Sequence, residues 1–149
     1  MKLIDATDTI MGRLASFAAV ELLKGEKVVI INAEKCIISG SRESIFEKYG
    51  HRRERKSVIN PLRFGPKYPR RPDGILRSAV KGMLPGKKTT GIKAYKNLRV
   101  FVGRPDELKD KKLDIVSVPE ANLKKLKIPR YVSLEELSRH LGASFEVES

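Results

Sequence analysis

A continuous run of β-branched residues, KVVIINA at residues 27–33, restricts the possible folds of this chain more than any other feature. Such runs are typical of strands that are covered on both faces, which usually means a parallel sheet. Residues 2–6 predict an earlier short strand, and residues 11–25 predict a helix because leucines and alanines recur there at helical spacing. Strand, helix and strand in this order indicate a right-handed crossover, and therefore an α/β fold.

Shorter patterns predict the remaining elements. We expect helices at residues 41–50, 73–84, 90–98 and 132–142, and strands at 98–103 and 112–118. Residues 35–40 are either a further short strand or the tail of the preceding one. The expected helix starts are at Ser41, Asp73, Thr90 and Ser133, and the expected glycine ends are at Gly25, Gly50 and Gly142.

The positive charge of the chain is concentrated in its middle third. The formal net charge is +13, but residues 48–104 hold seventeen Lys and Arg against only two acids, Glu54 and Asp73. The rest of the chain is slightly acidic, so the whole excess lies in this segment. A polyanion is the partner that such a distribution indicates, nucleic acid before anionic membrane. A solvated surface is the alternative, but it would mix the two signs along the chain.

Residues 51–73 predict a long basic loop within a single domain of residues 1–149. This segment carries eight Lys or Arg, four prolines and no sustained hydrophobic period. We expect it to be mobile until a partner orders it, since it offers little apolar surface to bury. Arginine can contact phosphate with two hydrogen bonds, and aromatic rings can stack on unpaired bases. The pattern indicates an irregular arm that enters folded RNA.

The stretch AVKGMLPGKKTTG at residues 79–91 combines an apolar helix end with cations. Ala79, Val80, Met83 and Leu84 could form one buried face, and the following Pro and Gly stop the helix. We expect the lysines and threonines after this break to meet phosphate oxygens, although an ordinary exposed turn is the alternative. A nucleotide phosphate loop is not indicated, because the glycine spacing is one residue too short and a lysine replaces the required hydroxyl.

Together these arguments give a set of candidate RNA-binding residues. Each of them carries a positive charge, a hydroxyl group or an aromatic ring. They are His51, Arg52, Arg53, Arg55, Lys56, Arg63, Phe64, Lys67, Tyr68, Arg70, Arg71, Arg77, Lys81, Lys87, Lys88, Thr89 and Thr90.

Other chemistry finds little support in the sequence. The single cysteine, Cys36, lies in an apolar run and is expected to be a buried structural thiol. His51 and His140 are too far apart in sequence to suggest a metal site with it, so we expect no metal and no cofactor. No apolar run reaches the length of a membrane span, and the N-terminus lacks the apolar core of a signal peptide.

Several motifs also resemble a known family. DATDTIMGRLAS, VVIINAEKCIISG, AVKGMLP and LRVFVG occur in order over roughly residues 3–103. This series resembles the universal L-thirteen family of large-subunit ribosomal proteins, and NPLRFGPKYPRRP is similar to its archaeal and eukaryotic branch. The region 104–149 is less diagnostic.

The resemblance implies a three-layer α/β/α domain around a central, mostly parallel four-stranded sheet. It implies a structural constituent of the large ribosomal subunit, which binds large-subunit ribosomal RNA beside neighbouring ribosomal proteins in the cytoplasm. It further implies a part in early subunit assembly and no enzyme activity.

Two other functions remain open at this stage. A stand-alone RNA-binding translational regulator would have the same affinity for RNA, and only its cellular context would differ. An α/β enzyme acting on nucleotides would need a cluster of acids, bases or metal ligands, and the basic segment offers only Glu54 and Asp73.

Overall fold

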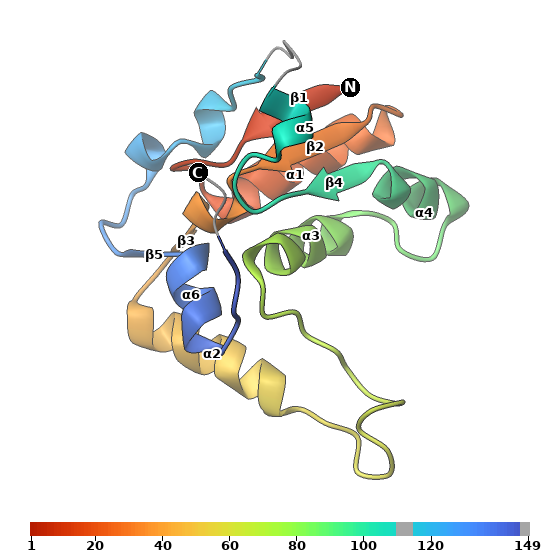
Figure 1. The fold of residues 1–149 in the computed structure, drawn as a ribbon, viewed down its shortest axis with the longest axis vertical. Helices are drawn as coiled ribbons and strands as arrows, with labels where there is room; N and C mark the ends of the chain where they lie inside the picture. Colours follow the sequence, from red (N-terminus) through yellow and green to blue (C-terminus); the bar gives the residue numbers. More distant parts are fainter. Residues whose placement is uncertain (110–114, 147–149) are drawn as a thin grey trace.

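Three parallel strands form the central sheet of the computed structural model, which describes residues 1–109 and 115–146 (Figure 1). The strands are β1 (Lys2–Asp5), β2 (Val28–Ile31) and β4 (Leu98–Val100), and β2 lies in the middle. All four residues of β2 are buried. The expectation of a strand covered on both faces is therefore confirmed.

Helices cover the two faces of this sheet unequally. Helices α1 (Met11–Leu23), α3 (Pro72–Met83) and α4 (Thr89–Lys96) contribute to one large core with Ile4, Val28 and Ile30. On the opposite face Leu3, Val29 and Ile31 pack with Leu108 of the short helix α5 (Asp106–Lys109). Among the described residues, no helix has the length and apolar character that a membrane crossing requires.

A second, two-stranded sheet joins the C-terminal part of the chain to the body. Strand β3 (Ile37–Ser39) pairs antiparallel with β5 (Tyr131–Ser133), so residues 35–40 contain a separate strand. Helix α2 (Arg42–Glu54) follows β3 and helix α6 (Leu134–His140) follows β5 (Figure 1). The rings of Phe46 and His140 stack between these two helices, with centroids 4.1 Å apart.

Short 3-10 turns complete the described elements. They are η1 (Ala33–Lys35), η2 (Pro119–Ala121) and η3 (Leu123–Lys125).

A fourth strand of the central sheet is not present among the described residues. Ile115 forms an isolated parallel bridge with Leu3 at the free edge of β1, and the backbone N–H of Val116 donates to the Leu3 carbonyl at 2.8 Å. Residues 116–118 belong to no strand, and residues 112–114 of the expected strand lie outside the described residues. The expected strand at 98–103 is also shorter, ending at Val100.

Side-chain caps bear out part of the predicted helix boundaries. Ser41 accepts a hydrogen bond from the Ser44 N–H at 3.4 Å, and Ser133 accepts one from Glu136 at 3.2 Å. Thr90 is not a cap, because α4 begins at Thr89 with Lys88 at the N-cap position. Asp73 is likewise the second residue of α3, since Pro72 takes the first helical position that suits its fixed φ.

The predicted end of α2 at Gly50 is wrong. The helix continues through His51, Arg52 and Arg53 to Glu54, and Gly50 does not adopt the positive φ of a C-terminal glycine. Interactions made beyond Gly50 favour the extra turn. Arg52 lies over the ring of Tyr49, and Arg53 donates to a carbonyl of the following loop. The irregular segment therefore spans residues 55–71 rather than 51–73.

We expect Cys36 to resist thiol reagents in the folded protein. Its side chain is fully buried, its Sγ donates to the Thr9 carbonyl at 3.2 Å, and burial raises its pKa from 9.0 to about 12. Because the thiolate is the reactive form, alkylation at pH 8 should be very slow. Mass spectrometry after iodoacetamide treatment measures this. The same sample in denaturant is the control and should be labelled fully, whereas rapid labelling of the folded chain would contradict the burial of this thiol.

Candidate nucleic-acid interface

The last turn of α2 places three candidate residues at the start of the loop. His51 is exposed, whereas Arg52 and Arg53 are half-buried. The Arg52 guanidinium carbon lies 5.2 Å from the centroid of the Tyr49 ring. Arg53 Nη1 donates a hydrogen bond to the Tyr68 carbonyl at 3.1 Å, so it fixes the returning end of the loop to the helix. Arg53 therefore positions the loop as well as carrying charge.

The loop of residues 55–71 extends away from the body and holds most of the candidate cations. All six of them are exposed, namely Arg55, Lys56, Arg63, Lys67, Arg70 and Arg71. A turn organises the tip, where the Phe64 N–H donates to the Asn60 carbonyl at 2.9 Å. Phe64 is 56% exposed and Arg63 lies over its ring, whereas Tyr68 is half-buried.

Four cations of this region line one groove. Arg53, Arg55, Lys56 and Lys67 surround a hollow of about 300 Å³ that is completed by loop prolines, Leu62 and Tyr68. Among the described residues, Arg55, Lys56 and Lys67 form no ion pair with a carboxylate. We call these three residues, together with Arg53, the loop groove. Its charge is available to an anion, since no carboxylate of the described part of the chain pairs with it.

The loop tip also carries an apolar group that the sequence patterns did not identify. Val58 is 98% exposed, Ile59 93% and Leu62 87%. Val58 and Leu62 are four residues apart, but no sustained period runs through the loop, so only their clustering between cations could have signalled an exposed apolar tip. A group of exposed apolar side chains usually marks a surface that contacts a partner.

Helix α3 and the turn after it supply the remaining candidates. Val80 and Leu84 are buried as expected, but Met83 is 45% exposed and does not belong to the apolar face. Arg77 and Lys81 are exposed on α3, and Lys87, Lys88, Thr89 and Thr90 are exposed where the chain turns into α4. The Lys88 N–H donates to the Pro85 carbonyl at 3.1 Å, which closes the turn.

Tyr95 of α4 is a residue of this region that the sequence patterns did not single out. The Arg77 guanidinium carbon lies 4.8 Å from the centroid of its ring, and Lys81 Nζ lies 5.6 Å from it. Arg77 and Lys81 are four residues apart, so helical spacing alone places them on one side of α3. The sequence does not show that the Tyr95 ring of α4 faces them, because this contact forms only when the two helices pack.

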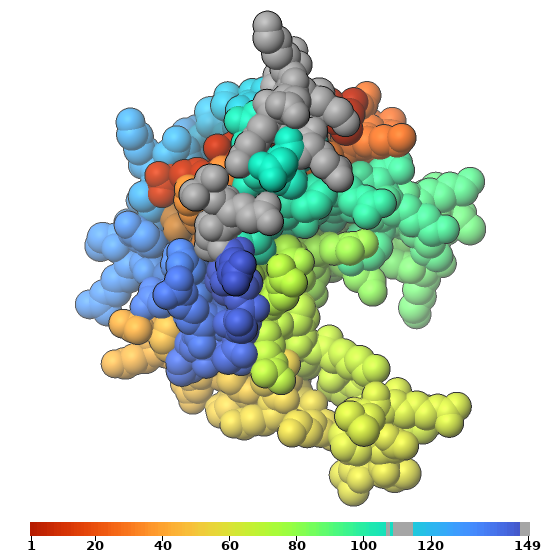
Figure 2. Space-filling view, in the orientation of Figure 1, coloured from red at the N-terminus to blue at the C-terminus, as the bar shows by residue number. Residues whose placement is uncertain are grey.

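We call the exposed cations of these elements the basic surface. Its members are Arg55, Lys56, Arg63, Lys67, Arg70, Arg71, Arg77, Lys81, Lys87 and Lys88. Figure 2 shows the loop and the α4 region projecting on either side of a hollow that α3 borders. Within the described residues 51–90, the only ion pair with a carboxylate joins Arg71 to Asp73, at 3.3 Å. An excess of like charge on a concave surface attracts a polyanion.

The structure does not gather the cysteine and the histidines into a site. Cys36 is buried beside Thr9, His51 is exposed on α2, and His140 stacks on Phe46. Among the described residues, no group of three or more His, Cys, Asp or Glu is placed to hold a metal ion.

Comparison with known proteins gives a consistent result. The family profile described as Ribosomal protein L13 matches residues 1–107. The chain is 48% identical over 145 residues to "Large ribosomal subunit protein uL13" of Methanocaldococcus jannaschii, covering 97% of this chain and 100% of that protein. It is 48% identical to the protein of that name in Methanosphaera stadtmanae, covering 96% of this chain and 98% of the relative. The protein of the same name in Archaeoglobus fulgidus is 43% identical over 93% of this chain and 86% of its own length. The region after residue 104 is thus shared with archaeal relatives.

Proposed function

The chain belongs to the ribosomal protein L13 family, and we propose that its basic surface binds large-subunit ribosomal RNA. Its relatives are named large ribosomal subunit proteins, and the chain is accordingly a structural constituent of the ribosome and not an enzyme. The proposal concerns which of its residues contact RNA and which interactions they make.

The observation that carries the proposal is the unneutralised charge of residues 48–104. Seventeen Lys and Arg stand against two acids, and the members of the basic surface are exposed on the loop, α3 and the turn into α4. A folded protein gains no stability from such repulsion. Release of counterions from the RNA backbone would make contact with phosphates favourable.

We assign different roles to cations and rings within this region. The cations of the basic surface and the hydroxyls of Thr89 and Thr90 would contact phosphates, which position the protein without reading sequence. Phe64, which is largely exposed, would stack on an unpaired base. The apolar tip of Val58, Ile59 and Leu62 would be covered in the assembled subunit by RNA or by a neighbouring ribosomal protein.

Sedimentation tests this role in the cell. We expect the protein to remain with large subunits through a high-salt wash, because the folded subunit would retain it even where salt weakens its phosphate contacts. Its incorporation into early assembly particles would show in gradients of the same lysate. Release from subunits at moderate salt, with the protein then bound to mRNA, would support a stand-alone regulator instead.

The turn into α4 gives a more local prediction. Replacing Lys87 and Lys88 together with alanine should lower the slope of log affinity against log salt by about 1 to 2, at roughly 0.7 to 0.9 for each phosphate that is no longer neutralised. The decrease should be similar across RNA sequences, because phosphate contacts carry no base information. A salt titration with a large-subunit RNA fragment measures the slope. An unchanged slope would mean that these lysines face solvent in the complex.

A further inference from the structure

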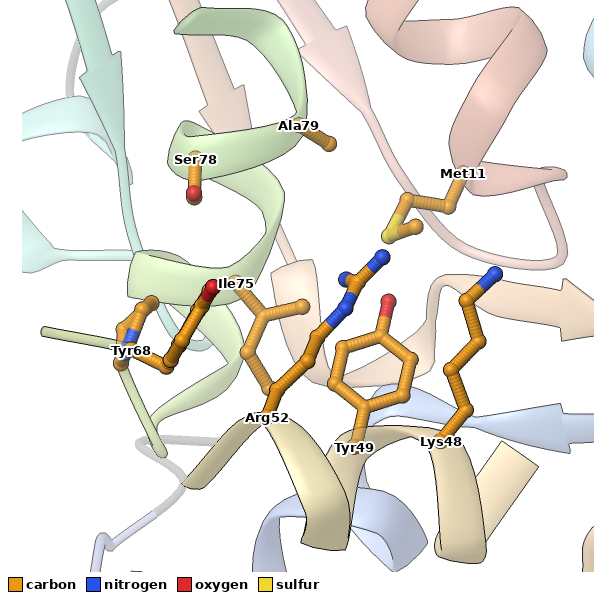
Figure 3. A pocket seen from close by; sticks show the side chains of 9 residues that line it. Met11, Lys48, Tyr49, Arg52, Tyr68, Ile75, Ser78 and Ala79 are labelled. Atoms are coloured by element: carbon orange, nitrogen blue, oxygen red, sulfur yellow. The ribbon is translucent and has the colours of Figure 1, made fainter. Parts of the chain in front are cut away.

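A cleft between α2 and α3 lies beside the loop but is not part of the basic surface (Figure 3). Its volume is about 260 Å³. Tyr49 and Arg52 line it from α2, Ile75 and Ala79 line it from α3, and Met11 closes one end. Figure 3 shows the side chains of Lys48, Tyr49 and Arg52 pointing from α2 toward Met11. Segments from four parts of the chain therefore meet around one small space.

Two tyrosines line this cleft. Neither the Tyr49 hydroxyl nor the Tyr68 hydroxyl makes a hydrogen bond to any residue that the structure describes. Burial raises the pKa of Tyr49 above its usual value, and the nearby Arg52 opposes this only in part. The hydroxyl is therefore a neutral donor at physiological pH. Neither hydroxyl oxygen is among the fully buried unpaired polar atoms of the described residues, so each is open to solvent and to a ligand.

The remaining lining combines apolar surface with positive charge. Met11, Ile75 and Ala79 offer apolar atoms, whereas Lys48 and Arg52 bring two cations, and no carboxylate of the described residues lines the cleft. The hydrogen bond from Arg53 to the Tyr68 carbonyl holds the loop side of the cleft against α2. A flat apolar body with polar edges and an attached negative charge matches this lining.

We propose that this cleft receives the base of a single unpaired nucleotide of the ribosomal RNA, with its phosphate on Lys48 and Arg52. The inference rests on the proposed function and adds to it a site that captures one extruded base. A volume of about 260 Å³, just below the roughly 300 Å³ at which pockets for drug-sized ligands begin, suits a single base. The Tyr49 hydroxyl would bond the edge of the base, while Met11 and Ile75 pack against its faces.

The cleft can be closed without removing charge. Ala79→Leu adds apolar atoms at the α3 wall and leaves every cation in place. We expect it to weaken binding to large-subunit ribosomal RNA by about 5- to 100-fold, on the order of the effect of one bound base, and to lower the salt slope by no more than about 1, since only one phosphate contact can be lost with the base. Tyr49→Phe should cost only a few-fold, because it removes the hydroxyl and keeps the ring. Chemical probing of the RNA should show one unpaired nucleotide that the unmodified protein protects and Ala79→Leu leaves reactive.

Ser44→Leu is the matched control, because Ser44 is exposed on α2 and does not line the cleft. It should bind as the unmodified protein does, and thermal melting should show that all three variants are folded. Equal affinity and equal protection for Ala79→Leu would overturn the inference while leaving the salt-dependent binding, and so the proposed function, intact. Normal RNA binding with poor incorporation of Ala79→Leu into subunits would also overturn it, since a protein side chain would then occupy the cleft. Absence of salt-dependent binding by the unmodified protein would overturn both.

Discussion

Replacing Arg55, Lys56 and Lys67 together with alanine is expected to lower the log–log salt slope of RNA binding by about 2 to 3. These residues line the loop groove, are exposed, and form no ion pair among the described residues. Each contact with phosphate contributes roughly 0.7 to 0.9 to the slope. At about 0.15 M salt the affinity should fall on the order of a hundredfold, while binding near 1 M salt should hardly change.

The same decrease in net charge elsewhere supplies the control. Lys27, Lys124 and Lys127 are exposed, lie outside the basic segment and have no ion pair among the described residues. Their replacement by alanine should change the slope by much less than the groove variant does. If both triple variants lowered the slope equally, general charge and not the loop groove would account for the binding.

Gly91→Ala is expected to destabilise the chain by about 1 to 3 kcal/mol, as overpacking of a tight contact does. A Cβ at Gly91 would lie only 2.7 Å from the Pro85 carbonyl carbon and 3.0 Å from Pro85 Cγ. The nearest atoms belong to backbone and a rigid ring, so the turn that carries Lys87 and Lys88 must shift. Thermal or urea unfolding measures the free energy of unfolding, and a salt titration shows whether the displaced lysines still contact RNA.

Gly82 provides a matched glycine in the neighbouring helix. A Cβ at Gly82 in α3 meets nothing within 4 Å, so Gly82→Ala should stabilise the chain by about 0.5 to 1 kcal/mol. If Gly91→Ala lowers the free energy of unfolding and Gly82→Ala raises it, the contact with Pro85 accounts for the loss. A neutral Gly91→Ala would mean that the turn adopts another conformation in solution.

The two largest effects thus separate two roles within one region. The loop supplies charge on an irregular backbone, and each of its cations acts where it meets a phosphate. The turn into α4 depends on close packing, because Gly91 allows the Pro85 carbonyl to approach the helix. A variant of the first kind should change affinity with little effect on folding, and a variant of the second kind should change both.

The sequence by itself determined the parts of this protein that depend on near neighbours along the chain. Hydrophobic period and β-branching identified β1, α1 and β2, and serine caps marked the starts of α2 and α6. The concentration of charge in residues 48–104 also needed no structure, since net charge is additive along a segment. These features indicated the α/β class and the kind of partner.

The tertiary structure decided what depends on residues that are distant in sequence. The helix continues past Gly50 because Arg52 and Arg53, in the next turn, interact with Tyr49 and with the Tyr68 carbonyl. The local preference of glycine for helix ends takes no account of such contacts. The pairing of β3 with β5 joins segments almost a hundred residues apart. The cleft is the clearest case, because Met11, Tyr49 and Ile75 share no pattern and meet only when three helices pack. Local preferences act over a few residues, whereas a binding site is a property of side chains that folding brings together.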